Sequence, residues 1–547
     1  MKKVSTLILS VLLVACLLLS GCSTKNSNAV GTTVDQTGSS NDAVTSTAGG
    51  TQDSSELSWK KDTSPVTFSC YIDFPWYYVD TWGKDDVSKE ITKRTGVSLK
   101  VTKGNDPSQL QVLLAADELP ELIFTDNQPE RFGNADISYA WDELIKKNAP
   151  EFMNMIDPVE ITNNTAADGH FYTLKTHYTN DAEFEDPRYI PSVGNPGFFV
   201  RQDIMNALGN PKLESFDDLL NVFQQVKEKY PDMVTFLPHY FFTNALMDFF
   251  GLNEANPYLG DDGKIHVGFD NPLFKDYYKF LNKLYLKGYM PKESYAYKTE
   301  QFNQIISSGK VFSASYNSEL ADSINRVYDA NGIKAHLVPV IKPLTYNGKV
   351  LCKPVDSSIG WANFFITKKN KNPERAIKFV EFLKSEEGQK LTQWGIEGKQ
   401  YTLSPEGYIT RPEGFNGLKI ADTGVGGWYF QASGLYEAVS FSSRKVDDPK
   451  YSSLVDLLSE RKKLTVRDPA LSFTTPPIDS DEYGISVKLK QMCQDTSIQI
   501  ITASSEAECM AKYDKMIEQA QKIGMDKLET FMTDNYNKAK AKYGASK

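Results

Sequence analysis

The sequence predicts an α/β protein built from two lobes, and three observations support this fold class. The folded part, residues 59–547, is too long for one ordinary hydrophobic core and suits two. Strand and helix patterns alternate from Val66 onward. Aromatic residues make up 12% of the chain, enough to build two cores. Alternation of this kind favours an α/β sheet, with ligand chemistry at the carboxyl ends of the strands.

The start of the folded part predicts a strand, a helix and a second strand. Apolar and mostly polar residues alternate across 66–72, which is the period of a strand. Val87 and Ile91 then lie at helical spacing before Gly96, and residues 97–101 alternate again. The next strand is predicted at 121–125.

Two later helices have clear start signals. Ser215 precedes a helical pattern and has Asp218 three residues after it, so the serine can cap the helix. Asn372-Pro373 opens another helix, with proline in the first turn, where its missing N–H costs nothing. Residues 311–315 have strand character.

The N-terminus has the zones of a secretory signal. Lys2 and Lys3 precede an apolar run over residues 7–19, which ends in Leu-Ser-Gly before Cys22. This ending resembles a bacterial lipobox, so we expect a signal peptide over 1–21 and acylation (palmitate) of Cys22. Cys16 also fits a loose lipobox, but cleavage there would halve the apolar segment. A retained membrane helix is the other alternative, although the run is shorter than the roughly 20 residues that span a bilayer.

Residues 22–58 are expected to form a disordered tether. They are almost entirely small or polar, a composition that cannot bury enough apolar surface to fold. A flexible linker of this length reaches roughly 35 Å. The protein is therefore expected at the extracellular face of the cell membrane, attached by lipid.

Charge and cysteine content exclude or leave open several functions. The net charge is −10, with 60 basic and 70 acidic residues, which disfavours nucleic acid as a partner. Export permits disulfides, but the spacing of the four later cysteines requires none, and free buried thiols are the simpler expectation. These cysteines are Cys70, Cys352, Cys493 and Cys509.

Catalytic motifs do not stand out. The chain has no nucleophile elbow, phosphate loop or dinucleotide turn, and no two of its five histidines share a short metal-ligand spacing. We therefore expect that the protein binds no cofactor and no metal and that it is not an enzyme. A surface-anchored glycosidase remains the alternative, because two carboxylates suffice for glycoside hydrolysis. The histidines are His170, His177, His239, His266 and His336.

Residues 372–405 read NPERAIKFVEFLKSEEGQKLTQWGIEGKQYTLSP, which resembles the family 1 extracellular solute-binding proteins, the carbohydrate-type receptors of ABC transporters. Further segments agree in order, and the match spans nearly all of the folded chain. They are ADELPELIFTD (116–126), AWDELIKKNAP (140–150), DGHFYTL (168–174), FFVRQDIMNALG (198–209), FLNKLYLKGYM (280–290) and ISSGKVFSA (306–314).

The resemblance implies the type II periplasmic-binding-protein-like fold, with a hinge and a ligand cleft between the lobes. It implies a monomer that captures an oligosaccharide and delivers it to ABC permeases. The calcium loop of long family members is expected to be absent, because residues 229–234 lack the alternating oxygen ligands. By analogy, lobe one holds 59–175 with a return at 311–360, and lobe two holds 176–310 and 361–547.

The candidate ligand-binding residues are aromatic and polar side chains at expected strand ends or in turn-rich stretches. A pyranose packs its C–H face on an aromatic ring, and its hydroxyls need polar partners. Trp394, at helical spacing from Leu391, is expected in the core. The candidates are Asp73, Trp76, Tyr77, Asp126, Tyr240, Tyr316, Asn317, Trp361 and Trp428.

Overall fold

The computed structural model describes most of the folded chain, and Ser55–Lys547 forms one compact unit. The predicted signal peptide, Cys22 and nearly all of the tether lie outside the described residues. No helix in the described part is both long and apolar enough to cross a membrane. The described ranges are 56–106, 108–191, 196–239, 244–253, 257–357, 359–415, 419–444, 452–477 and 480–545.

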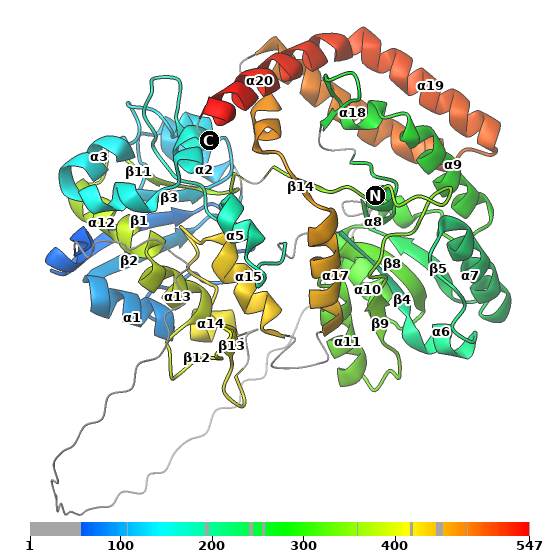
Figure 1. Cartoon of the computed structure of the whole chain (residues 1–547), viewed down its shortest axis with the longest axis horizontal. Coiled ribbons are helices and arrows are strands. Elements are labelled where there is room, and N and C mark those ends of the chain that lie inside the picture. Colours follow the sequence, from blue (N-terminus) through cyan, green and yellow to red (C-terminus); the bar gives the residue numbers. More distant parts are fainter. Residues whose placement is uncertain are drawn as a thin grey trace, which may run out of the picture. The chain divides into compact units, whose positions relative to one another are not determined.

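The first sheet has four strands in the order β11-β3-β1-β2. Its central strand β1 is parallel to β2 and β3, and β11 runs antiparallel to β3. Helices flank this sheet (Figure 1). The predicted strand-helix-strand opening is confirmed. The elements are β1 (Val66–Ile72), α1 (Asp86–Thr95), β2 (Val97–Lys103), α2 (Gln109–Ala115), β3 (Leu122–Thr125), α3 (Trp141–Asn148), β11 (Asn363–Ile366), α12 (Pro373–Lys384) and α13 (Glu386–Trp394).

Local sequence explains where α1 begins and ends. The Asp85 carboxylate accepts a hydrogen bond from the Ser88 backbone N–H at 2.7 Å and so caps the first turn. Gly96 ends the helix with φ +73°, and a Cβ there would lie 2.1 Å from the carbonyl oxygen of Thr63. Only glycine fits at this helix end.

The second sheet has the order β5-β8-β4-β9. β8 is parallel to β5 and antiparallel to β4. The predicted return of 311–360 to lobe one is therefore wrong, because β8 lies inside the second sheet. The assignment of 361–547 to lobe two is also wrong at its start, since β11 pairs with β3. The elements are β4 (Pro196–Arg201), α6 (Gln202–Ala207), α7 (Phe216–Lys229), β5 (Val234–Pro238), α8 (Asn244–Phe249), α10 (Thr299–Ser307), β8 (Val311–Asn317), α11 (Leu320–Ala330) and β9 (Leu337–Pro339).

Segments that lead from one sheet to the other meet around Arg467. β10 (Val355–Asp356) pairs in parallel with β14 (Val466–Arg467). The Arg467 guanidinium contacts the carboxylates of Asp356 and Asp181, each at 3.1 Å, and donates to the carbonyl of Thr179 at 2.7 Å. One side chain thus joins three connections between the sheets.

The C-terminal helices belong to the core that covers the second sheet. α18 (Asp481–Ile501) and α19 (Glu506–Ile523) pack against α9 (Leu273–Leu286) (Figure 1). α20 (Met525–Ala545) contacts β7 (Ile265–His266). The remaining elements are short, α17 excepted. They are η1 (Ser58–Lys61), η2 (Pro129–Arg131), η3 (Pro150–Met155), α4 (Pro158–Asn164), α5 (Asp181–Glu185), β6 (Tyr258–Leu259), η4 (Gly268–Asp270), η5 (Ser294–Ala296), β12 (Thr402–Leu403), β13 (Ile409–Thr410), α14 (Ile420–Thr423), α15 (Gly434–Ser442), α17 (Ser452–Leu464) and η7 (Pro469–Thr474).

The four cysteines of the folded part are buried thiols that form no disulfide. Burial raises the pKa of the Cys70 thiol well above its ordinary value, and it does the same to Cys352. A thiol that stays protonated is a poor nucleophile. These cysteines therefore act as small apolar residues of the core. The cysteines are Cys70, Cys352, Cys493 and Cys509.

Candidate functional site

Three large aromatic side chains lie exposed beside the carboxyl end of β1. Trp76 is 53% exposed and Tyr78 57%, both in the loop after β1, and Trp361, 37% exposed, lies just before β11. The ring centroids of Trp76 and Trp361 are 6.1 Å apart with planes tilted by 33°. Those of Trp76 and Tyr78 are 6.2 Å apart. We call these three residues the aromatic surface.

Buried rings support the aromatic surface from below. Phe74 has almost no exposure and lies 5.3 Å from Trp76 and 5.2 Å from Trp361, centroid to centroid. Tyr77 is also buried and packs 5.0 Å from Tyr429. The prediction that Tyr77 faces a ligand is therefore wrong. The loop turns Phe74 and Tyr77 into the core and leaves Trp76 and Tyr78 at the surface.

A polar chain orients Trp361. Its indole Nε1–H donates a hydrogen bond to Nδ1 of His177 at 3.2 Å. Nε2 of His177 lies 3.4 Å from the Glu437 carboxylate. Because Nδ1 accepts the indole hydrogen, the neutral ring carries its proton on Nε2, directed at Glu437. His177 also has φ +63°, which is uncommon outside glycine.

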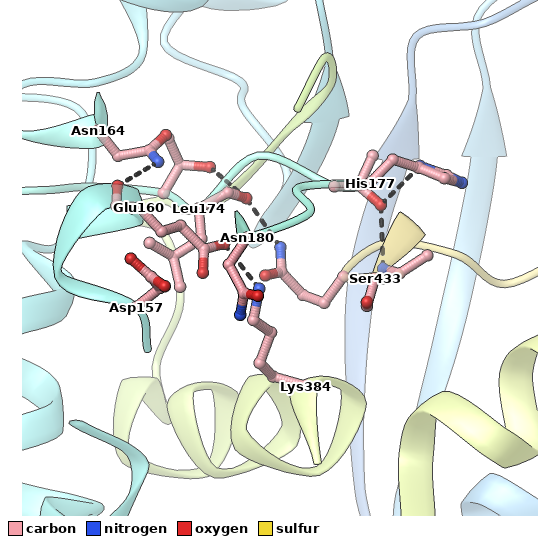
Figure 2. A network of polar contacts seen from close by, with 12 residues as sticks. Asp157, Glu160, Asn164, Leu174, His177, Asn180, Lys384 and Ser433 are labelled. Atoms are coloured by element: carbon pink, nitrogen blue, oxygen red, sulfur yellow. Dashed lines mark hydrogen bonds and ion pairs between the residues drawn. The ribbon is translucent and has the colours of Figure 1, made fainter. Parts of the chain in front are cut away.

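A buried network holds the segment that carries His177 (Figure 2). The Thr176 hydroxyl accepts from the backbone N–H of Ala432 at 3.0 Å, and the side-chain amide of Gln431 donates to the carbonyl of Leu174. Beneath this network, Lys384 and Glu160 form an almost completely buried ion pair at 2.6 Å. Burial raises the pKa of Glu160, and Lys384 offsets part of that rise. The network fixes two segments distant in sequence against each other.

The two predicted carboxylates at this edge differ in role. Asp73 and Asp126 follow neighbouring parallel strands, β1 and β3, so both lie at the same edge of the sheet. Asp73 is buried and accepts a hydrogen bond from the Thr125 hydroxyl at 2.9 Å. Burial raises its pKa, the hydrogen bonds from Thr125 and Asn127 lower it, and the charge of Asp126 adds to the rise. Asp126 is exposed and free to meet a ligand.

Glu319, which follows β8 of the second sheet, lies within electrostatic reach of Tyr78 in the aromatic surface. Burial raises the pKa of Tyr78, and the charges of Glu319 and Glu437 raise it further. Glu319 also forms an ion pair with Arg444 at 3.7 Å. The predicted Tyr316 and Asn317 end β8 and are partly buried, and the ring of Tyr316 stacks on Phe302 at 5.1 Å. Sequence reasoning missed His177, Glu437, Glu319 and Arg444, because no motif marks them.

Two further predicted residues do not join this site. Trp428 is fully buried in the core of the first sheet, where its Nε1–H donates to Asp85 at 2.9 Å and its ring packs 4.7 Å from Trp82. Its prediction as a wall of lobe two is wrong, because the N-terminal cap of α1 covers it. Tyr240 lies outside the described residues.

A separate cavity of about 390 Å³ opens at the opposite end of β1 and β2. It is lined by Pro65, Val66, Thr92 and Gly96, among others, at the amino ends of the strands. Ligands of open α/β sheets bind at the carboxyl ends. No aromatic side chain lines this cavity, so it is a weaker candidate for a sugar than the aromatic surface.

Comparisons with known proteins find relatives that cover most of this chain. A carbohydrate ABC transporter substrate-binding protein of Streptococcus pneumoniae is 25% identical over 465 residues, which cover 80% of this chain and 86% of the relative. Lipoprotein LipO of Bacillus subtilis is 22% identical over 484 residues, covering 83% and 89%. The solved structure of the S. pneumoniae substrate-binding protein FusA in complex with kestose matches with a TM-score of 0.65 at 17% identity, covering 88% of this chain and all of FusA.

These matches confirm the predicted fold class, the two-lobed α/β fold of periplasmic solute-binding proteins. The model of one family, bacterial extracellular solute-binding protein, matches residues 81–390, more than half of the chain. Members of this family bind solutes and are not enzymes. The chain therefore belongs to the bacterial extracellular solute-binding proteins, as the sequence resemblance predicted.

Proposed function

We propose that this protein is the substrate-binding component of an ABC importer and that it binds an oligosaccharide on the aromatic surface. The observation that carries the proposal is the exposure of Trp76, Tyr78 and Trp361 side by side at the carboxyl edge of the first sheet. Exposed indole and phenol rings fit the C–H faces of sugar rings. The names of its relatives, a carbohydrate ABC transporter protein and FusA with kestose, support the same ligand class.

Polar side chains around the rings supply partners for sugar hydroxyls. Asp126 and Glu437 accept hydrogen bonds, and Arg444 donates them. Of the predicted residues, Asn317 and Tyr316 extend this set from the second sheet. A buried hydroxyl without a partner costs about 1–3 kcal/mol, so such a rim distinguishes one sugar from another.

The hinge of the proposed receptor is the set of connections joined by Arg467. Elements of the first sheet and their helices form one lobe, roughly 59–178 and 359–444, and the second sheet with the C-terminal helices forms the other. Binding between lobes of this kind proceeds by hinge closure. The receptor works as a monomer that passes its ligand to membrane permeases.

Acylation of Cys22 would keep the receptor at the extracellular face of the membrane. The lipobox-like Leu-Ser-Gly-Cys sequence and the similarity to lipoprotein LipO support this. In cells fed a labelled fatty acid, Cys22→Ala should abolish incorporation into the protein, whereas the matched Cys16→Ala should not. Normal labelling of Cys22→Ala would contradict acylation at this position.

The ligand class is tested by titrating the purified protein with kestose and with malto- and xylo-oligosaccharides, by calorimetry and by tryptophan emission. We expect saturable binding of one molecule per protein for at least one sugar, with the sugar recovered unchanged by chromatography. Repeated turnover to shorter sugars would instead establish a glycosidase. Failure of every oligosaccharide to bind would contradict the proposed ligand class.

A further inference from the structure

Three potential metal ligands meet where the C-terminal helix crosses a small hairpin. They are His266 of β7, Asp270 at the end of η4 and Glu529 of α20. One ligand atom from each lies within 4.8 Å of the other two. All three side chains are partly buried, and none belongs to an element that carries the aromatic surface.

The spacing fits two ligands of one tetrahedral ion. Nδ1 of His266 and Oε2 of Glu529 are 3.2 Å apart. Two ligands at roughly 2.0–2.1 Å from a tetrahedral zinc ion lie about 3.3 Å from each other. The pair therefore already has nearly the separation that a shared ion requires.

Outer hydrogen bonds hold both ligands as in known metal sites. The other ring nitrogen of His266, Nε2, lies 3.1 Å from Oδ1 of Asp262, which forms the carboxylate-histidine pair that orients a metal-bound imidazole. The second oxygen of Glu529, Oε1, accepts from the backbone N–H of Val267 at 2.9 Å. These contacts leave Nδ1 and Oε2 directed at each other.

Asp270 is the third ligand and the most informative one. Within the described part of the chain its carboxylate forms neither a hydrogen bond nor an ion pair, although it is partly buried. Burial raises its pKa, His266 lowers it, and Asp526 raises it again. Asp270 lies near the carboxylates of Glu529 and Asp526, and only the imidazole of His266 offsets their negative charge. A bound cation would supply the missing positive charge.

We propose that His266, Asp270 and Glu529 bind a divalent transition-metal ion, best matched by zinc, that fastens α20 to the hairpin β6–β7. One nitrogen and two oxygens suit zinc better than calcium, which takes six to eight oxygen ligands. The fourth position is left for water. Binding requires the Nδ1 proton of His266 to leave, so one proton is released if the ring is charged beforehand.

The test uses the purified chain, stripped with EDTA and then titrated with zinc chloride by calorimetry, together with its thermal unfolding with and without zinc. We expect one zinc ion per protein and a rise in Tm. The decisive variant is Asp270→Asn, whose side chain holds no contact that the metal-free fold needs. It should keep the metal-free Tm and weaken zinc binding at least about tenfold.

Glu529→Gln and His266→Gln should weaken zinc binding as well, and Asp262→Asn should do so by about 10–100-fold through the lost outer hydrogen bond. The control is His336→Gln, which removes an exposed histidine paired with Asp329 at 2.9 Å and should change nothing. Zinc binding that is absent, or that is equal in the parent and Asp270→Asn, would overturn the proposal. In that case the cluster is only an ion pair between His266 and its carboxylates.

Discussion

The indole of Trp361 is oriented by His177, which accepts its hydrogen bond at 3.2 Å although 184 positions separate the two in the chain. His177 in turn is held by Glu437 on α15 and by its own unusual backbone conformation. Non-glycine residues with positive φ persist where the surrounding structure holds them, and they concentrate at binding sites. This relationship links a surface ring to the buried network below it.

Removal of either exposed tryptophan should weaken ligand binding and leave the fold intact. Trp76→Ala and Trp361→Ala should each cost about 1–3 kcal/mol of binding free energy, the scale for losing an aromatic anchor. The matched control is Trp428→Ala, which empties a fully buried position and should cost about 3–5 kcal/mol of stability. Measuring the calorimetric affinity and the Tm of the same three variants distinguishes a binding role from a core role. A large fall in Tm with unchanged affinity would remove Trp76 and Trp361 from the site.

Replacement of His177 should separate its role in orientation from its role in folding. His177→Asn keeps a hydrogen-bond acceptor and tolerates positive φ, so we expect near-parental Tm and a mild loss of affinity. His177→Val removes the acceptor and places a β-branched residue at φ +63°, which should cost about 1–3 kcal/mol of stability. The emission maximum of the tryptophans reports whether Trp361 loses its partner. Equal behaviour of the two variants would contradict the orienting role.

Loss of Arg467 should loosen the hinge. Arg467→Gln removes contacts to Asp181 and Asp356. The more buried contact with Asp356 contributes roughly 1.5–3 kcal/mol, and the contact with the exposed Asp181 less than about 1 kcal/mol. We expect a lower Tm. In solution scattering, the change in radius of gyration on ligand addition should differ between the variant and the parent. The control is Arg94→Gln, which removes a more exposed ion pair. Its loss should lower the stability by less than about 1 kcal/mol. Identical scattering profiles for Arg467→Gln and the parent would exclude this role.

The buried ion pair of Glu160 and Lys384 predicts a pH-dependent cost. Lys384→Met leaves Glu160 buried without a partner, which should cost about 3–5 kcal/mol at neutral pH. Burial already raises the pKa of Glu160, with Glu183 and Asp157 adding to it, and loss of Lys384 raises it further. Because the folded-state pKa lies above the unfolded one, stability is retained below the unfolded pKa of about 4.3 and lost as pH rises through the folded pKa.

The deficit of Lys384→Met relative to the parent should therefore shrink from pH 8 to pH 5, as measured by urea unfolding. The double variant Glu160→Gln with Lys384→Met should recover much of the loss at pH 8. A deficit that stays constant with pH would show that lost packing, and not the buried charge, sets the cost.

Local signals were sufficient for much of the fold. The Ser215 hydroxyl caps α7 as predicted, accepting from the Asp218 N–H at 3.1 Å, and α12 begins at Pro373 as predicted. Strand pairing was not predictable in the same way. The strand predicted at 311–315 lies in the second sheet and not in the lobe expected for it, because its apolar pattern specifies a buried strand and not the neighbours it pairs with.

The sequence by itself determined the strand-helix-strand opening, the starts of α7 and α12, the family and the loop from which a site was expected, since these depend on residues close together in the chain. Only the tertiary structure decided which aromatic rings are covered and which polar groups meet. Trp76 and Tyr77 are neighbours in one loop, yet Tyr77 is buried by Tyr429 and Trp76 is not. His266 and Glu529, 263 positions apart, become neighbours only because α20 folds back onto the hairpin, and spacing in a sequence carries no record of such contacts.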